Sequence, residues 1–345
     1  MGNFLRRFGI AAILALGAGS AAAEEVTLRV HHFLSPLSTT HKDFIVPWAE
    51  RVEAQSGGRI AVEIYPSMQL GGSPPNLYDQ VRDGVADVIW TLPGYTPGRF
   101  PLTDVFELPF VAANAEATSQ ALQEFYERHL TAEYAEVHVL MLHAHAAGSF
   151  HIRDRAVASL EDLRGLRIRA PSRITNQALE ALGVVPVGMP VPQVPEALSR
   201  GVVDGALLPY EVAHSLRVHE LVDHHTEVDT PRGFYTATFL FAMNRQVYEG
   251  LPGDLKAVID ANSGLTLARE IGAVWDRAET AGRQAAAEDG DSFTILSEEE
   301  AARWRERMQP VIESWIAEMD AAGHDGAALL EEARSLVAKY AEGEG

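Results

Sequence analysis

The chain of 345 residues contains no cysteine. This absence excludes disulfide bonds, thiol nucleophiles and cysteine-ligated metals. Stability must therefore come from a packed core. A hydrophobic content of 47% is ordinary for a globular protein, and the chain is long enough for two domains of common size.

Basic residues are also scarce, because 28 Lys and Arg stand against 48 Asp and Glu, for a formal net charge of -20. Such an acidic chain repels nucleic acids and anionic membrane surfaces. We therefore expect no nucleic-acid partner.

Long apolar runs are missing, and the one short run stands at the N-terminus. Arg6 and Arg7 precede "FGIAAILALGAG", and Ala21, Ala22 and Ala23 follow it. A basic start, an apolar stretch and an A-x-A site make up a secretory signal peptide, and the run is shorter than the roughly 20 residues that span a membrane. We predict a signal peptide over residues 1–23, cleaved near Ala23, and a periplasmic mature chain whose charge is -22, since the signal holds two arginines and no acid.

Short β-type runs alternate with amphipathic helical patterns, which predicts an α/β fold. Runs such as "VTLRVHH" and "ADVIWTL" come first, and "GLRIRAP" and "VDGALL" repeat the pattern in the middle of the chain. The later run "FYTATFLFAMNR" predicts a long strand that either returns to the first lobe or crosses between lobes. We predict lobe 1 over residues 24–148, lobe 2 over 149–233, and a crossing strand with C-terminal helices that pack on both lobes over 234–345.

The last hundred residues have a helical pattern, which Gly264 and Gly272 interrupt. Ser297 and Glu300 have the spacing of a capping box at a helix start. The helix that follows carries an apolar stripe that we interpret as core packing. The stripe consists of Trp304, Met308, Val311 and Trp315.

One arginine, Arg169, stands near the end of the predicted strand "GLRIRAP", just before Ala170 and Pro171. A guanidinium presents a rigid fork of donors that matches a carboxylate, so Arg169 is a candidate anchor for an acidic small molecule. On spacing alone, a surface salt bridge explains this arginine as well.

Several motifs in one order favour Arg169 as a ligand anchor over a surface salt bridge. They are "GGRIAVEIYPSMQLGG", "VRDGVADVIWTLPGYTPGRFP", "FELPFV", "DLRGLRIRAPS", "EALSRGVVDGA" and "LSEEEAARWRERMQPVIESWI". In this order, and over nearly the whole mature chain, the sequence resembles the DctP-type substrate-binding subunits of TRAP transporters, the tripartite ATP-independent periplasmic carriers.

The resemblance implies a two-lobed periplasmic-binding-protein-like fold that closes by hinge motion on one ligand, with a long helix spanning both lobes. It also implies that Arg169 forms a salt bridge to the ligand carboxylate. The loaded protein would deliver its ligand to membrane permease subunits driven by a sodium gradient. On this basis we expect a transport protein with neither enzymatic activity nor a cofactor.

Two positions depart from the sialic-acid-binding pattern of the family. Leu208 stands where that pattern has an asparagine, and the position of a second arginine falls at or near Ser149. Losing both polar contacts disfavours polyhydroxylated sugar acids, while an apolar lining orients a small ligand with few polar groups. We expect a small mono-carboxylate, such as a 2-oxo, 2-hydroxy or arylacetic-type acid.

The other candidate lining residues stand at predicted strand ends and in the loops after them. Each of them also has a structural explanation, either as core or, for Glu211, as the first turn of a helix. Glu211 could instead accept a hydrogen bond from a ligand hydroxyl or ammonium, or help to hold a cation. The candidates are His32, Phe33, Trp90, Tyr95, Met189, Leu208, Tyr210, Glu211, Phe234 and Tyr235.

Two alternatives stay open at this point. Histidine pairs, of which His143 and His145 share a strand face, would suit an exported metal-dependent hydrolase, although no pair has the helical spacing of a zinc protease and no nucleophile elbow is present. We therefore expect no metal. The solute-binding protein of an ATP-driven importer has the same two-lobed shape.

Overall fold

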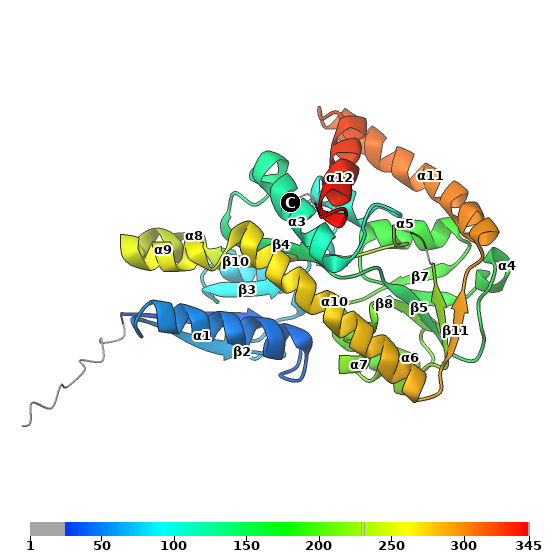
Figure 1. The fold of residues 1–345 in the computed structure, drawn as a ribbon, viewed down its shortest axis with the longest axis horizontal. Helices are drawn as coiled ribbons and strands as arrows, with labels where there is room; N and C mark the ends of the chain where they lie inside the picture. The colour runs from blue at the N-terminus through cyan, green and yellow to red at the C-terminus, as the bar shows by residue number, and fades with distance from the viewer. Residues whose placement is uncertain (1–24, 229, 231, 344–345) are drawn as a thin grey trace, which may run out of the picture.

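The computed structural model describes residues 25–228, 230 and 232–343. The predicted signal peptide, residues 1–23, lies outside the described residues. Two β-sheets, each covered by helices, form two lobes that lie beside one another (Figure 1). This arrangement confirms the two-lobed α/β fold that the sequence predicts.

The first sheet has the strand order β2-β1-β3-β10-β4. Strand β1 runs parallel to β2 and β3, whereas β10 is antiparallel to both β3 and β4. The strands are β1 (Val26–His32), β2 (Ile60–Tyr65), β3 (Val88–Thr91), β4 (Val137–Ala144) and β10 (Thr238–Asn244). The run "FYTATFLFAMNR" therefore returns to the first sheet, which was one of its two predicted positions.

The second sheet has the strand order β11-β9-β5-β8-β6-β7. Strand β6 is parallel to β7 and β8, and β5 is antiparallel to β8 and β9. The strands are β5 (Ser149–Ile152), β6 (Arg167–Ala170), β7 (Val185–Gly188), β8 (Gly205–Leu208), β9 (His224–Glu227) and β11 (Ser292–Ile295). Arg169 thus lies on a strand with neighbours on both sides, at its C-terminal end.

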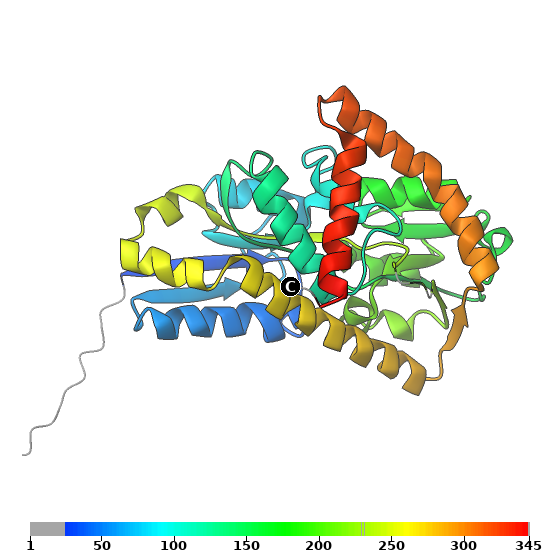
Figure 2. The same ribbon diagram turned by 45° about the horizontal axis from the view of Figure 1, so that its top comes forward.

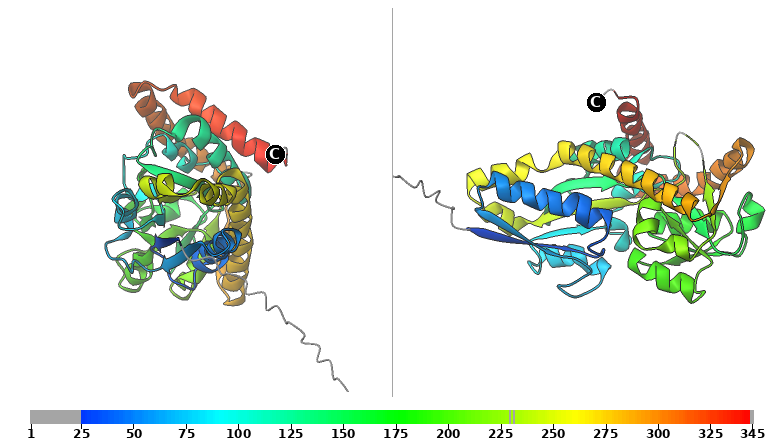
Figure 3. Two further views of the ribbon diagram at one scale, coloured as in Figure 1. Left: turned by 90° about the vertical axis from the view of Figure 1, so that its left-hand side faces the viewer. Right: turned by 60° about the horizontal axis from the view of Figure 1, so that its bottom comes forward.

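Helices cover both sheets, and the longest one, α10, runs along both lobes (Figures 1 and 2). Helices α11 and α12 form a hairpin that leads from the second lobe back over the first (Figure 3). The helices are α1 (Val46–Gln55), α2 (Leu77–Arg82), α3 (Ala115–Phe125), α4 (Leu160–Leu163), α5 (Arg173–Ala181), α6 (Val194–Ser199), α7 (Tyr210–Ser215), α8 (Arg245–Gly250), α9 (Gly253–Ala261), α10 (Gly264–Glu288), α11 (Glu298–Ala321) and α12 (Gly326–Ala341). Shorter 3-10 and π turns connect several of them.

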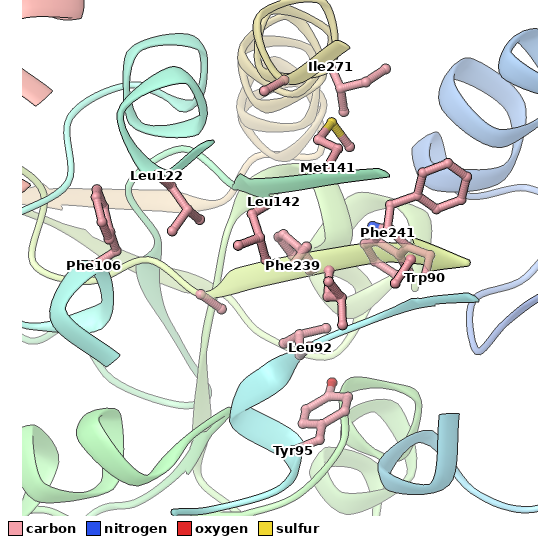
Figure 4. Close-up of a cluster of buried hydrophobic side chains, with 14 of the residues drawn as sticks. Trp90, Leu92, Tyr95, Phe106, Leu122, Met141, Leu142, Phe239, Phe241 and Ile271 are labelled. Atoms are coloured by element: carbon pink, nitrogen blue, oxygen red, sulfur yellow. The ribbon is translucent and has the colours of Figure 1, made fainter. Parts of the chain in front are cut away.

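Strand β10 lies between β3 and β4 and is buried along its whole length. Its alternate residues Phe239 and Phe241 lie toward Trp90, and Ile271 of α10 covers the other side of β4 (Figure 4). A strand with hydrogen-bonded neighbours at both edges and helices over the sheet has no solvent face, which explains why its sequence is apolar without alternation.

Helix α10 is fixed to the first lobe by Gly272 and Asp276. A Cβ at Gly272 would lie 2.5 Å from the Cα of Glu116, so only glycine permits this approach to α3. One turn on, the Asp276 carboxylate accepts the backbone N–H groups of Ala115 and Glu116 at 2.7 and 2.9 Å. These are unpaired donors at the start of α3, where a carboxylate is favourable.

The same helix is fixed to the second lobe by a second pair, Glu279 and Gly282. The Glu279 carboxylate accepts the backbone N–H of Glu211 at 2.9 Å, at the start of α7. A Cβ at Gly282 would lie 2.4 Å from the carbonyl oxygen of Tyr210. Burial raises the pKa of Glu279 to about 8, and the N–H groups of Glu211 and Tyr210 oppose that rise. The sequence pattern suggested that Gly272 interrupts the helix, but it lies inside α10, where it contacts α3 of the first lobe.

The predicted capping box at the start of α11 forms one of its two hydrogen bonds. The Ser297 side chain accepts the N–H of Glu300, as a capping residue does. The Glu300 carboxylate, however, accepts the N–H of Leu160 at 2.7 Å and the indole N–H of Trp304 at 3.1 Å. The predicted capping box is therefore half formed, because Glu300 connects α11 to α4. All four residues of the predicted stripe are buried, which confirms its role in core packing.

The contact at Gly272 predicts a position-specific loss of stability. Gly272→Ala is expected to lower the midpoint of urea unfolding, because overpacking against the α3 backbone costs about 1–3 kcal/mol and outweighs a gain in helix propensity of at most about 1 kcal/mol. Gly253→Ala is the matched control, since nothing lies within 4 Å of its Cβ position. Equal unfolding midpoints for the two variants would show that α10 is not tightly seated on α3.

Candidate ligand-binding site

A cavity lies between the lobes, and the empty space within it, counted together with the solvent at its mouth, is about 400 Å³. Its lining is mostly apolar and aromatic, with few polar groups. The lining residues are Phe33, Leu34, Trp90, Leu92, Tyr95, His145, Arg169, Pro171, Val191, Leu208, Pro209, Glu211, Val212, Tyr235, Ala237, Phe239 and Trp275.

Arg169 is 2% exposed and lies in this lining. Its Nε donates to the carbonyl oxygen of Met189 and its Nη1 to that of Leu207, each at 3.0 Å. Its Nη2 is buried and has no partner among the described residues, and no described carboxylate forms an ion pair with the guanidinium. Burial lowers the pKa of Arg169, and nearby Tyr95 and Tyr235 oppose that change.

An arginine stays charged in proteins, so burial without an acidic partner costs free energy. The two backbone carbonyls hold the guanidinium in place, on both sides of β6. The remaining donor, Nη2, is left for an anion in the cavity. The chemistry that fits this arrangement is a charge-assisted hydrogen bond to a carboxylate.

Aromatic rings form the walls. Phe33 stacks on Trp90 with ring centroids 5.0 Å apart, and Trp90 stacks on Phe239 at 4.8 Å with an interplanar angle of 14°. The indole Nε1 of Trp90 donates to Nε2 of His143 at 2.9 Å, which fixes the ring. Four of the lining residues, Trp90, Leu92, Tyr95 and Phe239, are labelled in the cluster of buried side chains in Figure 4.

Burial favours the neutral form of the two histidines beside the cavity, His143 and His145. His145 accepts the N–H of Ala237 with Nε2 at 2.9 Å and donates from Nδ1 to the carbonyl oxygen of Ala146. Burial lowers the pKa of His145 to about 4 and that of His143 to about 3. Within the described part of the chain, no group of three potential metal-ligating side chains is found. The histidine pair has a structural role here, holding the strand crossings and the ring of Trp90.

Several hydrogen bonds join the two lobes across the cavity. Tyr95 of the first lobe accepts the backbone N–H of Val191 at 2.9 Å with its hydroxyl oxygen. Arg173, at the start of α5, forms an ion pair with Asp104 of the first lobe at 2.6 Å. These two contacts hold elements of the two lobes together beside the cavity.

Seven of the residues singled out from the sequence line this cavity. They are Phe33, Trp90, Tyr95, Arg169, Leu208, Glu211 and Tyr235. The structure therefore brings together, from both lobes, residues that are up to about two hundred positions apart in the chain.

Four other candidates lie outside the cavity. His32 bonds His41 at 3.1 Å, and Tyr210 donates its hydroxyl to Glu227 at 2.7 Å. Phe234 packs on Trp304 in the second lobe's core, with centroids 5.5 Å apart. Met189 supplies only its carbonyl, to Arg169. His32 and Phe234 stand outside the helices and each precede a lining residue, because neighbouring residues in extended chain point to opposite sides.

Sequence reasoning missed ten lining residues: Leu34, Leu92, His145, Pro171, Val191, Pro209, Val212, Ala237, Phe239 and Trp275. Seven of them lie within two positions of a predicted site residue. Trp275 carried no such signal, because a tryptophan on an amphipathic helix has the pattern of core packing. Its position in the lining depends on how α10 crosses both lobes.

Comparisons with known proteins agree with this geometry. The family described as bacterial extracellular solute-binding protein, family 7 (DctP), matches residues 30–318. A TRAP solute-binding protein from a marine metagenome, specific for aromatic acid ligands and solved with metahydroxyphenylacetate, is 46% identical, with a TM-score of 0.90 over 92% of this chain and 99% of that one. A TRAP solute-binding protein from Rhodoferax ferrireducens, solved with copurified benzoate, is 45% identical with the same TM-score and coverage.

A more distant relative is the C4-dicarboxylate-binding periplasmic protein of Rhodobacter capsulatus, which is 26% identical over 84% of this chain and 86% of its own length. In the part of the chain that the structure describes, no helix combines the length and apolarity of a membrane span. The family match covers most of the chain and excludes the hydrolase and the ATP-driven importer as classes. The chain belongs to the DctP family of bacterial extracellular solute-binding proteins, the solute receptors of TRAP transporters.

Proposed function

We propose that the protein is a periplasmic receptor that captures a small aromatic mono-carboxylate through Arg169 and delivers it to TRAP membrane permease subunits. The observation that carries the proposal is the buried Nη2 of Arg169, which has no partner among the described residues and lies in a cavity with aromatic walls. A ligand carboxylate would supply the missing anion, and a ring would fill the space beside Trp90 and Phe239.

Among the acids that the sequence allowed, the relatives support one with an aromatic ring. Two solved relatives with 45–46% identity bind metahydroxyphenylacetate and benzoate. The cavity is consistent with such ligands, because it contains one cation and stacked rings and no second basic side chain in its lining. The predicted signal peptide would direct the chain to the periplasm, where the family acts.

Closure would strengthen the contact with the ligand. When the lobes meet, water leaves and charge-assisted hydrogen bonds gain strength in the drier site. The ligand stabilises the closed form only through contacts that it gains there. Tyr95, whose hydroxyl joins Val191 across the cavity, and Glu211 would both be part of this closed lining.

Removal of the anchor should abolish tight binding. Arg169→Ala is expected to lower the affinity for benzoate or phenylacetate at least a hundredfold in isothermal titration calorimetry, because an unpaired buried carboxylate costs about 3–5 kcal/mol. Arg169→Lys should recover part of that loss, since an ammonium keeps the charge but not the fork. Circular dichroism of both variants would establish that they fold. Wild-type affinity in a folded Arg169→Ala variant would place the anchor elsewhere.

The ligand class can be tested by thermal shift against a panel of acids. Benzoate, phenylacetate and their hydroxylated forms are expected to raise the melting temperature, because a ligand that binds only the folded state stabilises it by mass action. Succinate and glucuronate should leave it unchanged, since the cavity lining offers no cation for a second carboxylate and few partners for sugar hydroxyls. A shift with these two acids alone would contradict the aromatic assignment.

A further inference from the structure

Three cavity-lining side chains carry a buried polar atom that has no hydrogen-bond partner among the described residues. They are Nη2 of Arg169, Oε1 of Glu211 and Nε1 of Trp275. Native proteins rarely leave such atoms unpaired, so each one in a cavity indicates a group that a ligand supplies. The proposed function uses the first of them and leaves the other two unexplained.

Glu211 is held in place at the start of α7. Its backbone N–H donates to the Glu279 carboxylate on α10 at 2.9 Å, and Thr39 of the first lobe hydrogen-bonds its carboxyl group. The residue is only 6% exposed. Burial raises the pKa of Glu211 to about 7, nearby Asp43 adds to the rise and Thr39 opposes it. A carboxyl group that is easily neutralised can share the cavity with the carboxylate of a ligand.

Trp275, on α10, lines the same cavity as Glu211. Glu279, which receives the Glu211 N–H, follows Trp275 by four residues and so lies on the same helix face. The indole ring is fixed by His143 at a centroid distance of 4.9 Å and by Phe44 at 6.2 Å. An indole N–H can only donate a hydrogen bond.

An acceptor and a donor that line one cavity match the hydrogen-bonding capacity of a hydroxyl. A hydroxyl donates one hydrogen bond and accepts others, whereas an ammonium only donates and a second carboxylate only accepts. A hydroxyl could donate to Oε1 of Glu211 and accept from Nε1 of Trp275 at once. The Arg169 donor remains for the carboxylate of the same molecule.

We propose that Glu211 and Trp275 form a hydroxyl-binding subsite, so that the preferred ligand is a hydroxylated aromatic carboxylate. This inference rests on the proposed function and narrows its ligand class. The ring would lie between Arg169 at one end and the Glu211 and Trp275 pair at the other, against Trp90 and Phe239.

The test compares matched ligands by isothermal titration calorimetry. Benzoate and phenylacetate are measured beside their 2-, 3- and 4-hydroxy derivatives. Wild-type protein should bind at least one hydroxylated acid tenfold or more tightly than its parent acid, because the parent leaves both buried atoms unpaired or dependent on a trapped water. Glu211→Leu should bring the two affinities within about threefold, mainly by weakening the hydroxylated acid. Trp275→Phe should reduce the ratio in the same direction.

Asp43→Asn is the matched control, because Asp43 acts on Glu211 only through its charge and is itself exposed. It should keep the wild-type ratio of affinities. Equal wild-type affinities for parent and hydroxylated acids would overturn the subsite while leaving the aromatic receptor in place. If Glu211→Leu lowered the affinities for the parent and the hydroxylated acid equally, the subsite would also be overturned and the aromatic receptor would remain. Failure of every aromatic acid to bind wild-type protein would overturn both proposals.

Discussion

The buried guanidinium of Arg169 determines the chemistry of this protein. Carbonyl oxygens of Met189 and Leu207 hold two of its nitrogens, and the third donor is left facing the cavity without a counter-ion among the described residues. An uncompensated buried cation destabilises the empty closed form, and an anion removes that cost. In the proposed function, this side chain would couple the charge of the ligand to closure of the lobes.

Helix α10 connects the two lobes through contacts with α3 and α7. Asp276 binds the first N–H groups of α3 in one lobe, and Glu279 binds the N–H of Glu211 in the other, three residues further along the same helix. Gly272 and Gly282 bring the helix backbone close to each partner. One continuous helix thus connects α7, including Glu211, to the first lobe. The same helix places Trp275 in the cavity lining.

Much of the site could be predicted from the sequence where local pattern and site coincide. Arg169 stands at a strand end beside Ala170 and Pro171, and the alternation of an extended chain brings Phe33 and Tyr235 into the lining while His32 and Phe234 face away. The sequence did not show which residue of each pair faces the cavity, because that depends on what packs against each side of the strand. Trp275 and His145 were missed because a buried ring has the same sequence pattern in a core as in a pocket.

By itself, the sequence determined the α/β composition, a long apolar strand after residue 233 and the arginine that can anchor an acid. These follow from periodicity and local chemistry, which short stretches of chain carry. The two-lobed family fold was implied by the resemblance of several motifs, and the return of the strand to the first sheet was one of two predicted positions. Only the tertiary structure decided which polar atoms stay unpaired and that Glu211, Trp275 and Arg169 line one cavity. Residues from both lobes meet in this cavity because α10 contacts both lobes. The N–H of Ala237 also donates to His145, which joins the two chain segments that lead from one lobe to the other. No local sequence pattern records such long-range contacts.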